Sequence, residues 1–304
     1  MSNKIMDFIY ECRFRLEGIR VGLMAKFRKK EMDHLIRWRV ENAQVRALKN
    51  GTPQDKELAK YIIKNRHLQM LVFPGQEKYR NMKIEVLYDD EHDMRYVMFH
   101  GKKLYMKKNM NEDDIVACMR AIYEEQDDMS PHKYIYNEDD VKDKIVADIG
   151  AAEGFWSLDV IDFVKKVYIF EIDKDWCKAL NLTFAPYKDK VELVEKLVDS
   201  EDSAEATTLD SFFYGKKLDI IKADIEGYEM AMLHGGRKVL DGVKKLLICV
   251  YHRKIDEQDI RNELGRYGFR LSTTAGYVFN RDINDWRPET IAFKHGVIIA
   301  DNSE

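Results

Sequence analysis

The feature that most constrains the fold is a regular alternation of apolar strands and helical stretches beyond Asp143. Hydrophobic period and length predict strands over 145–149, 167–170, 191–198, 220–223 and 246–251, helices over 155–165, 174–184, 228–240 and 256–267, and a further group of strands at the end. Strands separated by single helices require crossover connections, which favour parallel strands with helices on both faces. The pattern therefore predicts a doubly wound α/β domain with a mostly parallel sheet.

The residues before this domain follow other patterns. Apolar spacing predicts helices over 4–27, 31–48, 53–71 and 111–126, and alternating residues predict short strands at 83–87, 96–99 and 104–106. The polar segment 135–143 marks a boundary, giving a helical and β-hairpin region (1–140) and a second domain (141–304). We expect the first region to act as a cap, a substrate contact or an oligomer contact. Its segment Glu125–His132 is a candidate lining of the site, against the alternative of a plain linker.

Charge and cysteine usage narrow the functional class. The net charge of −4 argues against a nucleic-acid partner, although residues 1–50 carry 12 Lys and Arg against 6 Asp and Glu. Basic residues within 13–30 predict either a membrane-surface contact or a solvated helix face. Four separated cysteines suggest neither a zinc site nor a disulfide framework. No apolar run reaches membrane-spanning length and no signal pattern is seen, so a cytoplasmic location is expected.

The most informative segment is a glycine-paired turn that follows the strand 145–149. The strand runs into Asp148, and the turn continues through Gly150, Ala151, Ala152, Glu153 and Gly154 into a helix. Glycines allow a sharp turn and a close backbone approach to a ligand. In a doubly wound sheet, this turn is where a nucleotide-like cofactor binds.

The spacing favours one cofactor over another. A dinucleotide site has the pattern G-x-G-x-x-G, but its middle glycine is Ala152 in this chain. Glu153 would repel a diphosphate and suits a cationic sulfonium ligand instead. The turn has the D-x-G-x-x-x-G form that methyltransferases use for S-adenosylmethionine, which we therefore expect as the cofactor.

Two further acidic residues are predicted to contact this cofactor. Glu171 follows the apolar strand 167–170 and is placed to accept hydrogen bonds from both ribose hydroxyls, ahead of Asp173. Asp199 is expected at the end of the third strand, where the adenine would lie.

The chemical end is predicted at the next two strands. Asp224 ends the strand 220–223, and Glu226 and Glu229 follow within six residues, an arrangement that costs repulsion unless it is used. An alternative explanation for Glu229 is structural, because an acidic residue favours the start of a helix such as the next one. His252 ends the neighbouring strand and should reach the same sheet edge, which makes Asp224, Glu226 and His252 candidate catalytic residues.

These motifs resemble the FkbM family of methyltransferases. The resemblance covers residues 144–252 and rests on VADIGAAEGFW, YIFEID, TLDSFF, KADIEGYEMAMLHGGRKVL and ICVYH. It implies a seven-stranded class I methyltransferase sheet and transfer of a methyl group from S-adenosylmethionine to a hydroxyl of a sugar, a polysaccharide or a natural product. It implies nothing for residues 1–110.

Several alternatives stay open. In the expected mechanism His252 is the general base, and Asp224 and Glu226 orient it, hold neighbouring hydroxyls of the acceptor or bind Mg²⁺. No metal ligand is assigned. The rival functions are a non-catalytic interaction protein that keeps the methyltransferase fold, and a nicotinamide-dependent dehydrogenase.

Overall fold

The computed structural model describes residues 53–64, 71–134, 137–252, 257–280 and 292–302. The chain divides into two compact units, Met1–Leu68 with Arg281–Ala292, and Gln69–Asn280 with Phe293–Glu304. In the first unit the description is essentially limited to helix α2 (Pro53–Lys64), which starts at the predicted residue. The helices predicted over 4–27 and 31–48, with the basic residues of 13–30, lie outside the described residues. None of the helices described is long and apolar enough to cross a membrane.

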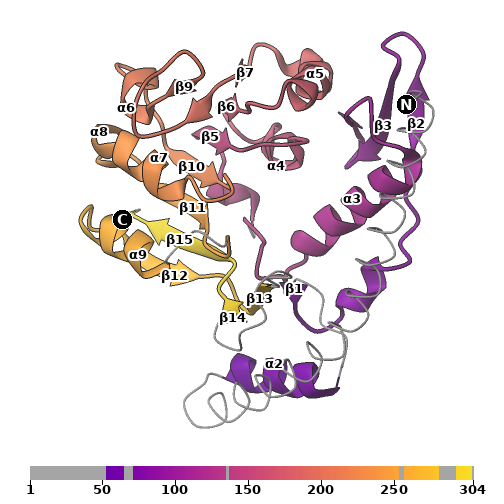
Figure 1. Ribbon diagram of the computed structural model, residues 1–304, viewed down its shortest axis with the longest axis horizontal. Helices are drawn as coiled ribbons and strands as arrows, with labels where there is room; N and C mark the ends of the chain where they lie inside the picture. Colours follow the sequence, from indigo (N-terminus) through magenta and orange to yellow (C-terminus); the bar gives the residue numbers. More distant parts are fainter. Residues whose placement is uncertain (1–52, 65–70, 135–136, 253–256, 281–291, 303–304) are drawn as a thin grey trace, which may run out of the picture. The chain divides into compact units, whose positions relative to one another are not determined.

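The second unit contains a seven-stranded sheet in the order β12-β15-β11-β10-β5-β6-β7 (Figure 1). Its strands are β5 (Ile145–Ile149), β6 (Lys166–Phe170), β7 (Val191–Val194), β10 (Ile220–Ala223), β11 (Lys245–Cys249), β12 (Arg270–Thr273) and β15 (Val297–Asp301). β15 runs antiparallel to both β11 and β12, and the other neighbouring pairs are parallel. The predicted mostly parallel sheet of the class I methyltransferase type is confirmed.

Alternate residues of the central strands feed two hydrophobic cores. Val146 belongs to the core formed with α4 (Phe155–Val160) and α5 (Lys174–Thr183). Ala147 belongs to the core on the opposite face, formed with the helices α6 (Leu209–Phe212), α7 (Glu229–Gly235), α8 (Arg237–Leu240) and α9 (Glu257–Gly265). Burial on both faces explains why these strands read as continuous apolar runs.

The segment that precedes the sheet shares the first of these cores. It contains a three-stranded antiparallel sheet of β2 (Leu87–Asp89), β3 (Met94–Phe99) and β4 (Lys102–Tyr105), followed by α3 (Glu112–Glu125). Side chains of β3, β4 and α3 pack in one cluster with Val146. A short strand, β1 (Leu71–Val72), pairs with β13 (Tyr277–Asn280), and β14 (Ala292–Lys294) completes that sheet. The functional division at residue 140 stays a prediction.

Several predicted elements are wrong in extent. The helix predicted over 155–165 ends at Val160. The strand predicted over 83–87 is replaced by β2, because Ile84 and Val86 pack against the core without pairing to β3. The strand predicted over 191–198 is two strands. β7 ends at Val194, and β8 (Leu197–Val198) leaves the main sheet to pair with β9 (Ala206–Thr207).

The helix predicted over 228–240 is also interrupted. It divides into α7 and α8 at Gly235 and Gly236. A Cβ at Gly235 would lie 2.2 Å from the carbonyl oxygen of Asp199, so the chain approaches the helix too closely there for any side chain.

The strand order places the site. From β5 the chain runs outward through β6 to β7, and it then returns to place β10 on the other side of β5. The carboxyl ends of β5 and β10 therefore flank the topological switch point, where ligands bind in open α/β sheets.

Candidate active site

The turn after β5 is held by the end of the neighbouring strand. The backbone N–H groups of Gly150 and Ala151 both donate to the carbonyl oxygen of Phe170, at 3.0 and 3.3 Å. Gly150, Ala152 and Gly154 have φ values of 74°, 49° and 80°, so three of five residues are in the left-handed region. Such a tightly folded loop presents backbone atoms at the switch point.

The glycines serve contacts within the protein as well as the turn. A Cβ at Gly150 would lie 2.1 Å from the carbonyl oxygen of Asp224, and one at Gly154 would lie 2.5 Å from a methyl carbon of Leu180. The sequence interpretation, in which these glycines make room for a ligand, is therefore incomplete. Gly150 makes room for the end of β10, and Gly154 makes room for α5.

Asp148 lies beneath this loop and is fully buried. Its carboxylate is 2.9 Å from the ammonium group of Lys222 and accepts a hydrogen bond of 2.7 Å from the Ser157 hydroxyl. Lys222 also donates to the carbonyl oxygen of Gly150 at 2.9 Å. Asp148 thus fixes the loop from below.

Glu171 stands at the carboxyl end of β6 and faces the same loop. Its carboxylate accepts hydrogen bonds of 2.8 Å from the backbone N–H groups of Ala152, Ile172 and Asp173. The side chain of Ile172 is 47% exposed beside it. Asp173 instead caps the N-terminus of α5, accepting from the N–H groups of residues 175 and 176. Glu171 is accordingly the better placed of the two acids for a ribose.

Two other predicted cofactor residues are placed differently. Glu153 is buried within the turn. Asp199 follows β8, outside the main sheet, and its carboxylate accepts from the N–H of Ser200. The reason given for Asp199, that it ends the third strand of the sheet, is wrong, because that strand ends at Val194.

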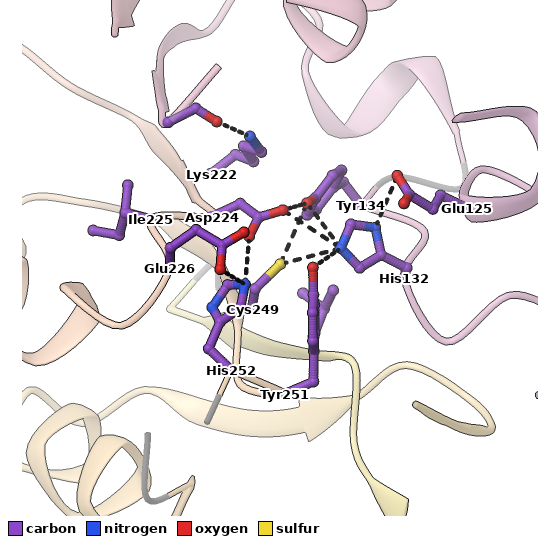
Figure 2. A network of polar contacts seen from close by, with 12 residues as sticks. Glu125, His132, Tyr134, Lys222, Asp224, Ile225, Glu226, Cys249, Tyr251 and His252 are labelled. Carbon is purple, nitrogen blue, oxygen red and sulfur yellow. Dashed lines mark hydrogen bonds and ion pairs between the residues drawn. The ribbon is translucent and has the colours of Figure 1, made fainter. Parts of the chain in front are cut away.

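Figure 2 shows the second half of the site, which gathers around Asp224 at the end of β10. The Tyr134 hydroxyl donates to its Oδ2 at 2.8 Å, and Nε2 of His252 lies 3.1 Å from its Oδ1. The other ring nitrogen of His252, Nδ1, lies 2.9 Å from the buried carboxylate of Glu229. Asp224 keeps 21% of its side chain exposed, so a ligand can reach it.

Glu226 occupies the rim of this cluster. Its backbone is left-handed, with φ 53°, and its side chain is 88% exposed. One carboxylate oxygen lies 3.7 Å from Nε2 of His252. The structure therefore brings Asp224, Glu226 and His252 together, as the sequence predicts.

Comparison with known proteins agrees with this arrangement. Residues 198–271, which include β10, Asp224 and His252, match the model of the family described as the methyltransferase FkbM domain. This part of the chain is therefore similar to the FkbM methyltransferase domain. A search of curated proteins found no match.

Solved structures similar to this chain share little sequence with it. A methyltransferase FkbM from Methylobacillus flagellatus KT is 15% identical with a TM-score of 0.40, covering 82% of this chain and 62% of that one. An rRNA methylase from Streptococcus thermophilus is 14% identical (TM-score 0.36, 55% and 92% covered). The magnesium protoporphyrin IX methyltransferase from Synechocystis PCC 6803, with bound SAM, is 16% identical (TM-score 0.37, 53% and 71% covered). The chain thus spans less than two thirds of the Methylobacillus protein's length.

The electrostatics of this site change the role expected for His252. Burial favours the neutral ring, but Asp224 and Glu229 outweigh burial and raise the pKa of His252 to about 10. At neutral pH the ring is an imidazolium, which cannot accept a proton. The expectation that His252 is the general base near neutral pH is therefore not supported by its surroundings.

The pKa of Asp224 is shifted in the opposite direction. Burial favours its neutral form, yet His132, His252 and Lys222 hold the pKa of Asp224 well below its usual range. Although burial opposes the charged form of Lys222, Asp148 and Asp224 raise the pKa of this lysine. The site thus keeps a partly exposed carboxylate charged among buried ionised groups.

The donor atoms around Asp224 do not suit the Mg²⁺ considered from sequence. Magnesium prefers an octahedron of oxygen ligands. Here the atoms within reach include ring nitrogens and the thiol of Cys249, whose pKa burial raises well above its usual value. Both oxygens of Asp224 already face imidazole or phenol groups. No step through magnesium is therefore derived.

Sequence reasoning did not assign three residues of this site. Lys222 carries a visible signal, because a lysine interrupts the otherwise apolar strand β10. His132 and Tyr134 are both buried and come from the segment before the sheet. The segment ending at His132 is a candidate lining of the site from its sequence, with a plain linker as the alternative, and nothing in the sequence pairs either side chain with Asp224.

Proposed function

We propose that this protein is an S-adenosylmethionine-dependent O-methyltransferase that acts on a hydroxyl of a sugar, a polysaccharide or a related natural product. One observation carries the proposal: a charged, partly exposed carboxylate, Asp224, stands against the glycine turn at the switch point of the sheet. The turn suits the methionine part of the cofactor, and the carboxylate is within reach of an acceptor bound next to it.

The residues present fit the cofactor. Glu171 is held rigidly by three backbone N–H groups and retains lone pairs for the two ribose hydroxyls. The exposed side chain of Ile172 offers an apolar surface for the adenine. Burial raises the pKa of Glu153 to about 7, so a cationic ligand would favour its ionised form. Asp148 and Lys222 hold the loop that carries these contacts.

S-adenosylmethionine, when bound, supplies an electrophilic methyl group on a good leaving group. The acceptor oxygen forms the new O–C bond, the electron pair of the C–S bond stays on sulfur, and the hydroxyl proton passes to Asp224. A weak base suffices, because the hydroxyl becomes strongly acidic as its oxygen gains the methyl carbon. The main contribution of the protein is alignment of the acceptor and exclusion of water.

The roles of the neighbours follow. His252 and Glu229 fix one oxygen of Asp224 in place, so His252 is a positioning residue in this mechanism. Glu226 is exposed at the rim and is available to accept hydrogen bonds from neighbouring hydroxyls of the acceptor. A polyhydroxylated acceptor suits an exposed carboxylate at this rim.

The test has two arms. Calorimetry with S-adenosylmethionine, its demethylated product and NAD should show binding of the first two only, and Glu171→Ala should weaken that binding by about 10-fold or more. Formation of the demethylated product should then be followed with a panel of methyl glycosides. Asp224→Asn should lower turnover at least ~100-fold with cofactor affinity kept within a few-fold.

Glu91→Gln, at an exposed residue of the turn between β2 and β3, is the matched control and should behave as the wild type. NAD binding without S-adenosylmethionine binding would favour a dehydrogenase. Cofactor binding without turnover of any hydroxyl acceptor would favour the non-catalytic alternative.

A further inference from the structure

Three acidic side chains and two histidines alternate in a continuous array through the site. Nδ1 of His132 lies 3.7 Å from Glu125, and Nε2 of His132 lies 3.5 Å from Oδ2 of Asp224. Beyond Asp224 the array continues to His252 at 3.1 Å and to Glu229 at 2.9 Å. Carboxylate and imidazole groups thus alternate over the whole length, with Asp224 at the centre. Figure 2 labels the array from Glu125 to His252.

We propose that His132, with Glu125 behind it, is a positioning residue for the methyl-transfer reaction, acting through Asp224 from the side opposite His252. The proposal rests on the proposed function and adds to it a half of the site that comes from outside the family-matched segment. Asp224 is then clamped at both oxygens, and its remaining exposed lone pair is directed at the acceptor.

The geometry around His132 supports this role over simple packing. The residue is buried, and its Nε2 is the nitrogen that faces Asp224. The Tyr251 hydroxyl is 3.1 Å from this nitrogen, and the Tyr134 hydroxyl is 3.3 Å from it. Since Tyr134 itself donates to Oδ2 of Asp224, the ring and the phenol together determine which way that oxygen points.

The titratable groups that face His132 come from several elements. They are Glu125 at the end of α3, Tyr134 in its own segment, Lys222 and Asp224 on and after β10, and Cys249 and Tyr251 at the end of β11. Burial favours the neutral ring, but Glu125 and Asp224 outweigh it and raise the pKa of His132. An imidazolium at this position stabilises Asp224 as a carboxylate, the form that accepts the proton.

The same atoms also suggest a metal site. His132, Asp224 and Cys249 each offer a donor atom, and these atoms lie within 4.8 Å of one another. However, the Tyr134 hydroxyl lies among them, 2.8 Å from Asp224, 3.3 Å from His132 and 3.3 Å from Cys249. A hydrogen-bonded centre explains these contacts without an ion, and we make the metal an outcome of the test.

The kinetic test compares His132→Gln, which keeps an N–H donor without the charge, with His132→Phe, which loses both. His92→Gln, at a partly exposed histidine of the same region, is the matched control. With a methyl glycoside as acceptor, His132→Gln should lower kcat about 10- to 100-fold while leaving KM for S-adenosylmethionine within about 2-fold. His132→Phe should be slower still.

The pH profile separates positioning from packing. Without the His132 charge the pKa of Asp224 should rise, so the acid limb of kcat should move to higher pH in His132→Gln. Equal kcat and an unmoved acid limb would overturn the proposal. So would a stoichiometric metal, measured by elemental analysis, that is present in the wild type and lost in Cys249→Ser.

A second measurement does not depend on the acceptor. In histidine-labelled protein, ¹⁵N NMR should show His132 and His252 as imidazolium rings at pH 7, and His132→Gln should change the titration of His252. A His132 ring that titrates alone near its ordinary value of about 6.5 would refute the array. If the wild type methylates no glycoside, the proposed function fails, while this NMR result still decides the array.

Discussion

At Lys222 a single ammonium group joins the cofactor loop to the end of β10. It is buried, pairs with Asp148 and donates to the carbonyl oxygen of Gly150. Lys222→Met would leave the buried Asp148 without its counter-ion, which costs about 3–5 kcal/mol of unfolding free energy. Urea titration measures this loss, and Lys238→Met, at an exposed lysine, should change little.

The double variant Lys222→Met with Asp148→Asn decides the cause. Removing both charges should recover part of the stability lost by the single change, because no unpaired ion is then buried. Additive losses in the two single variants would show that the ion pair is not the reason for the effect.

We expect His252 to make the stability of the folded protein fall at alkaline pH. Its pKa is raised to about 10 from 6.5, so the stability it contributes is fully present below pH 6.5 and is lost as pH rises through 10. Between pH 7 and 10 the wild type should lose on the order of 3 kcal/mol more than His252→Gln. Urea midpoints at matched pH values measure the difference, and parallel curves for the two proteins would contradict it.

At the scale of elements, the contact between the β5 turn and the end of β10 allows no side chain at residue 150. Gly150→Ala would place a Cβ 2.1 Å from the Asp224 carbonyl oxygen in a backbone with φ 74°. We expect a loss of about 3 kcal/mol or more, with a displaced Asp224 and lower turnover.

Gly215→Ala is the matched control for this change. Gly215 has a similar φ of 71°, but no atom lies within 4 Å of the Cβ that an alanine would add. Gly215→Ala should therefore cost only about 1 kcal/mol of unfolding free energy. Denaturation of both variants separates the close contact from the backbone strain, and equal losses would rule out the contact as the cause.

The same elements show what sequence can predict. The limits of β5 and β10 were predicted to the residue, because each is a buried apolar run that ends at a turn. The hydrophobic pattern predicts one strand over 191–198. It does not reveal that the backbone turns after Val194 and that Leu197–Val198 pairs with β9 instead. The hydrophobic pattern of a segment indicates that it is buried, whereas its hydrogen-bond partners depend on the rest of the fold.

The site divides along the same line. Asp224, Glu226 and His252 were predicted together, because parallel strands bring their carboxyl ends to one edge. His132 and Tyr134 could not be predicted, since their contacts with Asp224 join residues about 90 positions apart through a segment that belongs to no strand of the main sheet. Likewise, the raised pKa of His252 depends on Asp224 and also on Glu229, for which a position at the start of a helix is an equally good explanation from sequence.

At the scale of the whole molecule, the segment before the sheet is part of the core. Residues of β3, β4 and α3 pack in one cluster with β5. A fragment of residues 141–304 should therefore aggregate or expose apolar surface, whereas a fragment of residues 69–304 should unfold cooperatively. Dye binding and thermal unfolding measure this, and a stable monomeric 141–304 fragment would contradict the shared core.

The close approach at Gly150 has a consequence for how the reaction is aligned. At Gly150, the loop that would hold the methyl donor meets the main chain of Asp224, the residue whose carboxylate would take the proton. The distance between the methyl donor and the base is therefore set by the backbone of the sheet. Substitutions elsewhere on the surface can remodel the acceptor's entrance while the distance across which the methyl group moves stays the same.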